Sequence, residues 1–240
     1  MASKPTFRWG LLVALAGLVL TGQTLADNTL TKKETQQGWQ LLFDGNDMSQ
    51  WRNFKKEGLN PEWVVEDGAM KLTGAGGGDI LTRKTYRNFD LRLEWQISEG
   101  GNSGIFILVD EQGERIYSHA PEIQILDDAK HSDRAIDSHR SGSLYDMVAS
   151  HPSSRKPAGE WNKVRILFVD GFLRVWQNRI NTVTITIGDS TWNTLLRNSK
   201  FAQGKNSGFE GFAEATSGHI GLQDHWDKVW FRNIRILELD

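Results

Sequence analysis

Apolar and polar residues alternate in short runs along most of this chain. The clearest run covers residues 89–97, where every odd-numbered position is apolar. Because successive side chains of a strand point to opposite faces, this run predicts a strand with one face in a core. The residues on its other face are polar: Asp90, Arg92, Glu94 and Gln96.

Similar runs, bounded by turn residues, predict further strands. They cover residues 39–43, 63–66, 69–72, 79–82, 105–109, 121–128, 161–169, 172–177, 181–187, 219–225 and 229–239. Asp67-Gly68 lies between two of these runs and favours a tight type I′ hairpin turn. Two short helices are expected, one begun by a capping box at Thr31 and ended by Gly38, the other over residues 190–198.

This order of elements indicates the fold class. Short strands follow one another with frequent turns, and no strand–helix–strand rhythm appears, so the sheets are expected to be antiparallel. We therefore predict an all-β protein, a two-sheet antiparallel β-sandwich or jelly roll with one or two short helices. No repeat, low-complexity segment or linker divides the chain, so we expect one domain over residues 27–240.

The first 26 residues have the pattern of a signal peptide. Lys4 and Arg8 precede an apolar run over residues 11–20, and small residues occupy the positions before a cut after Ala26. The chain has no cysteine, so neither a lipid anchor at that cut nor a disulfide framework is expected. We predict an exported protein, periplasmic or secreted, with no stable membrane anchor after cleavage.

Composition narrows the class of partner. Removing Lys4 and Arg8 with the leader takes the formal net charge from −2 to −4, which argues against a nucleic-acid partner, because such binding needs a basic surface. The chain has 10 tryptophans and 24 glycines. Exposed aromatic rings suit the faces of sugars, although most tryptophans of a β-protein lie in its core. A small carbohydrate partner is compatible with this composition, but the composition alone does not select it.

The strand at residues 121–128 carries the most distinctive polar pattern. Glu122 and Gln124 share one face, and Ile123 and Ile125 share the other. Taken alone, this pattern is typical of a half-buried strand with one solvent-exposed face. A strand-poor, polar segment follows it, however, and long irregular segments beside a strand are where binding sites concentrate. That segment contains His131, Asp133, His139, Tyr145 and Asp146.

Two chemistries can be weighed for this strand from its residue types. The spacing of Glu122, Gln124 and Asp127 is similar to the ExDxxE pattern of laminarinases and lichenases. In those enzymes one carboxylate is the nucleophile and another is the general acid/base. Gln124 at the middle position makes direct glycosidase chemistry less favoured. A divalent metal on Glu122, Asp127, His139 and His225 is a further alternative, although their spacing matches no standard zinc motif.

Several segments of the chain, taken in order, resemble the 3-keto-disaccharide hydrolase domain family. They are GWQLLFDG (38–45), GNSGI (101–105), PEIQILD (121–127), SGSLYD (141–146), GEWN (159–162), SKF (199–201) and GHIGLQDH (218–225) followed by FRNI (231–234). The resemblance covers nearly all of the mature chain. It departs at Trp176-Gln177-Asn178-Arg179, where Arg179 stands in place of a turn glycine.

The resemblance implies a concanavalin A-like jelly roll that acts on oxidised glycosides. A ketone at C3 acidifies the C2 proton, so a base can remove it and the C1 substituent can leave by elimination, after which water adds. The base is expected to be Glu122 or His139, and the acid Asp127 or His225. The residues expected to bind sugar hydroxyls or the enolate oxygen are Asn102, Gln124, Tyr145 and Gln223.

Two other functions stay open at the level of sequence. One is a non-catalytic carbohydrate-binding sandwich that uses tryptophans as stacking platforms. The other is a glycosidase that acts on unoxidised β-glucan. The clustered acid and base candidates favour an enzyme, since a lectin needs amides and aromatic rings rather than titratable pairs.

Overall fold

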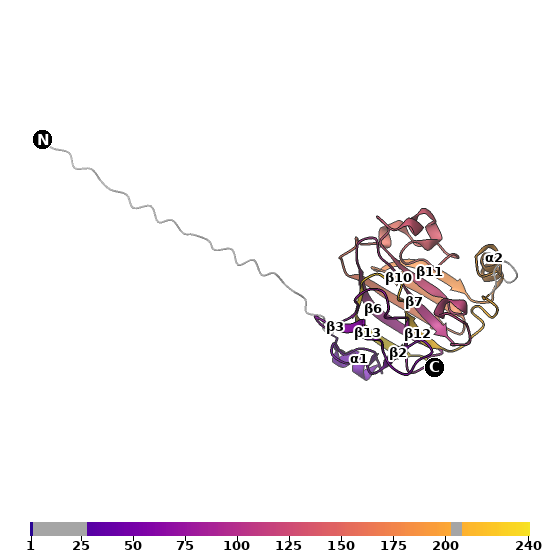
Figure 1. Cartoon of the computed structure of the whole chain (residues 1–240), viewed down its shortest axis with the longest axis horizontal. Helices are drawn as coiled ribbons and strands as arrows, with labels where there is room; N and C mark the ends of the chain where they lie inside the picture. Colours follow the sequence, from indigo (N-terminus) through magenta and orange to yellow (C-terminus); the bar gives the residue numbers. More distant parts are fainter. Residues whose placement is uncertain (2–27, 203–207) are drawn as a thin grey trace.

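The computed structural model describes Met1, residues 28–202 and residues 208–240. The segment expected to be a signal peptide, residues 1–26, lies outside the described residues apart from Met1. In the described part, helix α1 is Lys32–Gln36 and helix α2 is Ser190–Asn198. No described helix is long and apolar enough to span a membrane. Figure 1 shows α1 and α2 at opposite sides of the molecule, outside the sheets.

The strands form two antiparallel sheets. The larger sheet contains β1 (Gln40–Leu41), β3 (Trp63–Glu66), β4 (Ala69–Leu72), β6 (Phe89–Ile97), β9 (Asn162–Val169), β10 (Phe172–Gln177), β11 (Ile180–Thr186) and β13 (Val229–Glu238). The smaller sheet contains β2 (Trp51–Asn53), β5 (Ile80–Thr82), β7 (Asn102–Val109), β8 (Glu122–Leu126) and β12 (His219–Leu222). The predicted all-β, two-sheet sandwich is confirmed.

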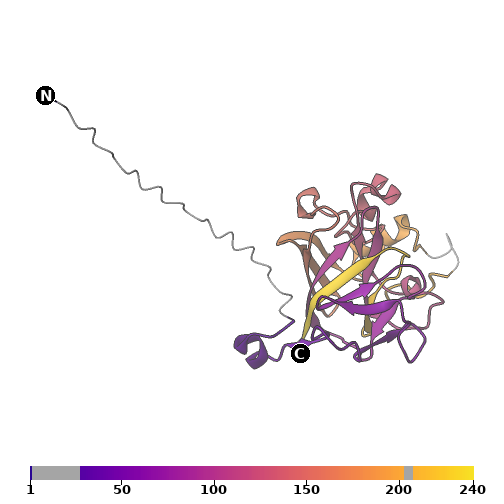
Figure 2. The same cartoon turned by 60° about the vertical axis from the view of Figure 1, so that its left-hand side comes forward.

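Strand order differs from chain order in both sheets. The larger sheet runs β11-β10-β9-β6-β13-β4-β3, with β1 paired to β13, and the smaller runs β2-β5-β12-β7-β8. In Figure 2 the yellow C-terminal strand lies beside violet strands from the first half of the chain, in agreement with the pairing of β13 with β4 and β6. Short 3₁₀ turns complete the fold: η1 (Ile116–Ser118), η2 (Ser132–Ala135), η3 (Asp137–His139) and η4 (Pro152–Ser154).

Local sequence signals explain most element boundaries. The Asp67-Gly68 turn between β3 and β4 has positive φ at both residues, 49° and 73°, as a type I′ turn requires. Thr31 and Glu34 form the predicted capping box of α1, and the Asp189 side chain accepts from Trp192 N at the start of α2. The three-residue strand β2 was not predicted, because so short a run shows no alternation.

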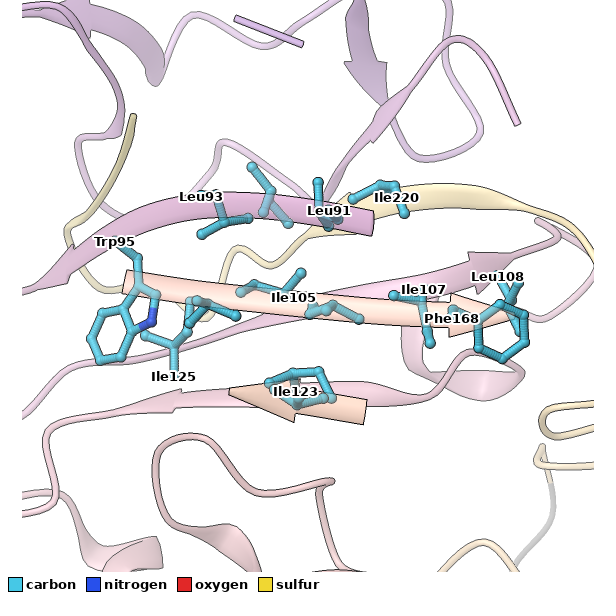
Figure 3. Close-up of a cluster of buried hydrophobic side chains, with 14 of the residues drawn as sticks. Leu91, Leu93, Trp95, Ile105, Ile107, Leu108, Ile123, Ile125, Phe168 and Ile220 are labelled. Carbon is cyan, nitrogen blue, oxygen red and sulfur yellow. The ribbon is translucent and has the colours of Figure 1, made fainter. Parts of the chain in front are cut away.

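The core lies between the two sheets. Figure 3 shows apolar side chains of β6 pointing toward those of β7 and β8. They include Leu91, Leu93, Trp95, Ile105, Ile107, Ile123 and Ile125, all buried. Each such side chain contributes roughly 1.5–3 kcal/mol by leaving water. Because strand side chains alternate, this packing fixes Glu122 and Gln124 on the outer face of the smaller sheet.

The outer face of the larger sheet is polar, as predicted from β6, but its carboxylates are largely shielded from water. Asp90 and Glu94 are only 4% and 9% exposed. Asp90 pairs with Arg165 at 2.9 Å, and Glu94 pairs with Arg232 at 2.9 Å. Arg232 also lies 3.9 Å from the centre of the Trp161 ring. Ion pairs and stacked tryptophans therefore cover this face.

Candidate active site

A cavity of about 310 Å³ lies on the outer face of the smaller sheet, over β7 and β8. Its lining residues are Asn102, Tyr117, Glu122, Gln124, Asp133, Tyr145, Lys200, Phe209, Gln223 and His225. Six residues predicted for the site line this cavity: Asn102, Glu122, Gln124, Tyr145, Gln223 and His225. The remaining two, Asp127 and His139, do not. The cavity thus gathers residues from five well-separated parts of the chain.

Glu122 lies diagonally from Gly104 of the neighbouring strand, and its carboxyl reaches the space beside that glycine. In the pairing of β7 with β8, Gly104 is opposite Gln124 and Phe106 is opposite Glu122. A Cβ atom on Gly104 would come within 2.2 Å of Oε1 of Glu122. Only glycine leaves room for the carboxyl at this point. The GNSG sequence at residues 101–104 is therefore part of the site and not simply a turn.

The surroundings of Glu122 make its carboxyl unusually reluctant to ionise. The side chain is buried, with 6% of the residue exposed. Burial raises the pKa of Glu122 to about 8; the Lys200 ammonium opposes this rise, and the carboxylates of Asp79 and Asp133 add to it. Once deprotonated, such a carboxylate is a stronger base than one in water.

Lys200 brings a positive charge to the same cavity. Its Nζ lies 4.1 Å from the centre of the Tyr145 ring, and its backbone N donates to Oδ2 of Asp146 at 2.6 Å. Burial lowers the pKa of Lys200, whereas Glu122, Asp146 and Asp133 act to raise it. Sequence reasoning gave Lys200 no role, although the segment SKF (199–201) was one of those carrying the family resemblance.

The Tyr145 ring, which lies next to Lys200, stacks on the ring of His139. The two ring centres are 4.3 Å apart, and Nε2 of His139 lies 2.8 Å from Oδ1 of Asp146. The Tyr145 hydroxyl donates to Oδ2 of Asp133 at 3.3 Å. Burial holds the pKa of Tyr145 well above its ordinary value, so the hydroxyl remains a hydrogen-bond donor. His139 is placed to orient Tyr145 and does not itself line the cavity.

Asp127 is turned toward the backbone. Its Oδ2 accepts the N–H of Gly100 at 2.7 Å, and its Oδ1 accepts the N–H of Ala129 at 3.0 Å. The carboxylate thus fixes the loop before β7 and the turn after β8. The four-residue metal set considered from sequence is not assembled, since Asp127 and His139 lie outside the cavity. Among the described residues, no group of three or more His, Asp or Glu side chains is arranged to hold a metal ion.

The amide side chains of the cavity have unused hydrogen-bonding capacity. Nε2 of Gln124 donates to Oδ1 of Asn102 at 3.3 Å. Oε1 of Gln124 and Oε1 of Gln223 are buried without a hydrogen-bond partner among the described residues. Buried polar atoms are nearly always paired, so two such acceptors in one cavity point to a ligand with hydroxyl groups.

A larger cavity, of about 490 Å³, lies on the outer face of the larger sheet. Its lining includes Arg92, Arg165 and Arg235. These arginines already pair with carboxylates, Arg92 and Arg165 with Asp90 and Arg235 with Glu34. Of these two cavities of the described residues, the smaller one brings together a desolvated carboxyl, a half-buried cation and amide oxygens without a partner, so we take it as the candidate active site.

Comparison with known proteins gives a family match. A family model described as 3-keto-alpha-glucoside-1,2-lyase-like domain matches residues 38–237. A 3-keto-disaccharide hydrolase of Bacteroides thetaiotaomicron is 39% identical over 233 residues, covering 85% of this chain and 79% of that protein.

Several solved structures have a similar fold. A protein of Parabacteroides distasonis assigned to the glycosyl hydrolases has a TM-score of 0.80 and 31% identity, covering 89% of this chain and all of that one. A second protein of that organism, with the same assignment, has a TM-score of 0.64 and 26% identity, covering 84% and 99%. A Bacillus subtilis protein with a galectin-like fold, 11% identical with a TM-score of 0.53, shares the fold alone.

Proposed function

The chain belongs to the family of 3-keto-alpha-glucoside-1,2-lyase-like domains. We propose that it cleaves 3-keto-glycosides, including 3-keto-disaccharides, by elimination followed by hydration. Family membership makes it a carbohydrate hydrolase that acts on glycosidic bonds. The proposal concerns the oxidised substrate and the order of bond changes.

The reaction begins with removal of the proton at C2. The electron pair of that C–H bond moves toward the C3 carbonyl and gives an enolate. Collapse of the enolate forms the C1–C2 double bond and expels the C1 oxygen, which takes up a proton. Water then adds across the unsaturated ketone, its hydroxyl to C1 and its proton to C2, so the net change is hydrolysis.

Glu122 is the base in this proposal, and Lys200 with Tyr145 binds the enolate oxygen. The desolvated carboxylate of Glu122 is basic enough to compete for a proton made acidic by a ketone. The ammonium supplies positive charge where negative charge develops. The Tyr145 hydroxyl keeps its proton, and in this scheme it turns from Oδ2 of Asp133 to donate to the enolate oxygen. His225, which lines the same cavity, is the acid for the departing oxygen.

The observation that carries the proposal is the shared cavity of Glu122, Lys200 and the free amide oxygens of Gln124 and Gln223. The first pair supplies acid–base and electrostatic chemistry. The amide oxygens accept hydrogen bonds from sugar hydroxyls. Of the candidate acids and bases from sequence, Asp127 and His139 have no part in this scheme because their side chains do not line the cavity.

The test is incubation of the protein with a 3-keto-disaccharide and, in parallel, with its unoxidised parent. Release of sugar from the ketone alone is expected. Release from both substrates would identify an ordinary glycosidase, and binding without release would identify a carbohydrate-binding sandwich.

The same incubation in heavy water separates elimination from direct hydrolysis. Addition of D₂O to the unsaturated ketone places deuterium at C2 of the product, whereas direct displacement at C1 leaves C2 untouched. Product incubated in heavy water without enzyme gives the background exchange. A C2 position no richer in deuterium than that background would remove the elimination step.

Export is also part of the proposal. The apolar run and cleavage pattern of residues 1–26 support it. Mass spectrometry of the protein recovered from periplasm or medium is expected to give a mature N-terminus at Asp27. Recovery of the uncleaved chain in the cytoplasm would contradict this expectation.

A further inference from the structure

A second cavity, of about 340 Å³, adjoins the candidate active site. Three residues line both cavities: Tyr117, Gln223 and His225. The two spaces are therefore neighbours that share a wall. A ligand with two linked rings can occupy both, with its linkage at the shared wall.

Trp226 lies at the second cavity with most of its surface in solvent. The residue is 71% exposed, which is rare for so large an apolar side chain. Its indole lies 5.4 Å from the His225 ring, measured between ring centres. An exposed ring beside a cavity offers a flat apolar surface to a ligand.

The backbone that carries this ring is tied to a neighbouring loop. Trp226 has a φ of 71°, a left-handed conformation that costs a bulky residue on the order of 1 kcal/mol. Oδ1 of Asp224 accepts the Trp226 N–H at 2.8 Å, and Oδ2 of Asp224 accepts the N–H of Gly78 at 2.7 Å. Asp224 thus ties the Trp226 turn to the loop before β5 and fixes the backbone from which the indole ring projects.

Carboxyl groups also line the second cavity. Asp79 and Asp224 both line it, and Oδ1 of Asp79 accepts the backbone N–H of Asp224 at 2.9 Å. Burial raises the pKa of Asp79 to about 7; the hydrogen bond from the Asp224 N–H opposes this rise, and the negative charge of Asp224 adds to it. A flat apolar ring and carboxyl groups in one cavity match a sugar ring, which has an apolar C–H face and a rim of hydroxyls.

We propose that the second cavity is the subsite for the leaving sugar, with Trp226 as its stacking platform. This inference rests on the proposed function. The glycosidic oxygen then lies at the shared wall, beside His225 and Tyr117. The Tyr117 hydroxyl is itself held there, because it accepts from Nη1 of Arg115 at 2.6 Å. The enzyme accordingly favours glycosides whose leaving group is a second ring over those with a small leaving group.

The test compares two substrates in the Trp226→Ala variant. One is a 3-keto-disaccharide, and the other is the methyl glycoside of the same 3-keto sugar, which has no second ring. For the disaccharide, kcat/KM is expected to fall by about tenfold or more, mainly through KM. For the methyl glycoside it is expected to stay within about twofold of wild type.

Two further variants complete the experiment. Trp230→Ala removes the same side chain from β13, outside both cavities, and is expected to leave the ratio of the two substrates unchanged. Trp226→Phe is expected to restore part of the loss. Equal effects of Trp226→Ala on both substrates, or no effect on either, would overturn the subsite. Failure of the wild-type protein to cleave either ketone would instead overturn the proposed function, and the subsite with it.

Discussion

The outer faces of the two sheets are built from similar alternating strands, but the buried glutamate on each face has a different electrostatic environment. On the larger sheet, Glu94 is buried against Arg232 at 2.9 Å. On the smaller sheet, Glu122 is buried with its pKa raised to about 8, because desolvation outweighs the opposing effect of Lys200. One glutamate is locked in a strong ion pair, and the other holds a proton that it can exchange.

The difference lies in what covers each face. Arginines from neighbouring strands, stacked on tryptophans, cover β6, and an arginine stays charged in any protein environment. An irregular segment and Lys200 cover β8, and a lysine that is partly desolvated loses its proton more readily than one in water. Burial alone therefore does not make a carboxyl reactive. It does so where the matching charge is incomplete and a cavity gives substrate access.

The largest expected effect is on activity, from Glu122→Gln. Removing the general base is expected to lower kcat on a 3-keto-disaccharide by about 10²–10⁴-fold, while the fold is kept, because a neutral amide replaces a desolvated carboxyl. Steady-state kinetics and urea unfolding at pH 8 check both parts. Turnover equal to wild type would remove Glu122 from the mechanism.

The next effect tests how Glu122 is placed. Gly104→Ala puts a methyl group where the Glu122 carboxylate lies, and a displacement of about 1 Å is expected to cost up to about 100-fold in kcat/KM. If the methyl group acts only through Glu122, the double variant Gly104→Ala, Glu122→Gln is no slower than Glu122→Gln alone.

A matched control for that substitution exists on the same face. Gly221 of β12 faces Leu81, Ile116 and Phe106 and not the catalytic groups. Gly221→Ala is expected to lower the free energy of unfolding by crowding these side chains, with little change in kcat/KM. Loss of activity on the scale of Gly104→Ala would show that any added bulk on this sheet disturbs the site, and would end the argument for a specific contact.

A smaller effect, this time on stability, is expected on the other face. Glu94→Gln leaves Arg232 without its charged partner and is expected to lower the free energy of unfolding by about 1–3 kcal/mol. Activity on the 3-keto-disaccharide is expected to remain near wild type, because Glu94 lies on the other sheet. Urea unfolding and kinetics on the same preparation measure both. Lost activity with intact stability would reverse the roles of the two faces.

Sequence reasoning reached the strands and one face of the site, because alternation is a local property. It placed Glu122 and Gln124 together with no knowledge of the sheet order. It could not give Lys200 a role, since that residue reaches the cavity from beyond α2 through its backbone contact with Asp146. Nor could spacing tell that Asp127 turns toward two backbone N–H groups. Such outcomes depend on neighbours brought together by the fold.

The same limit applies to the outer face of the larger sheet. Alternation placed Asp90 and Glu94 away from the core, as the structure confirms. The arginines that bury them, Arg165 and Arg232, come from β9 and β13, which flank β6. That strand order is not encoded in any single run of residues, so the ion pairs could not be predicted.

The change of stability with pH separates the two glutamates most directly. The pKa of Glu122 rises from the model-peptide value of 4.5 to about 8 on folding, so below about pH 4.5 both states hold the proton and the group costs nothing. Between about pH 5 and 8 the unfolded state releases it first, and the folded state loses up to about 1.4 kcal/mol per pH unit. The stability gained by Glu122→Gln is therefore expected to grow across this window and to level off above it, as urea unfolding of both proteins at each pH can show. A difference that stays constant from pH 5 to pH 8 would mean that Glu122 is as firmly ionised as a paired surface carboxylate, and the contrast between the two faces would disappear.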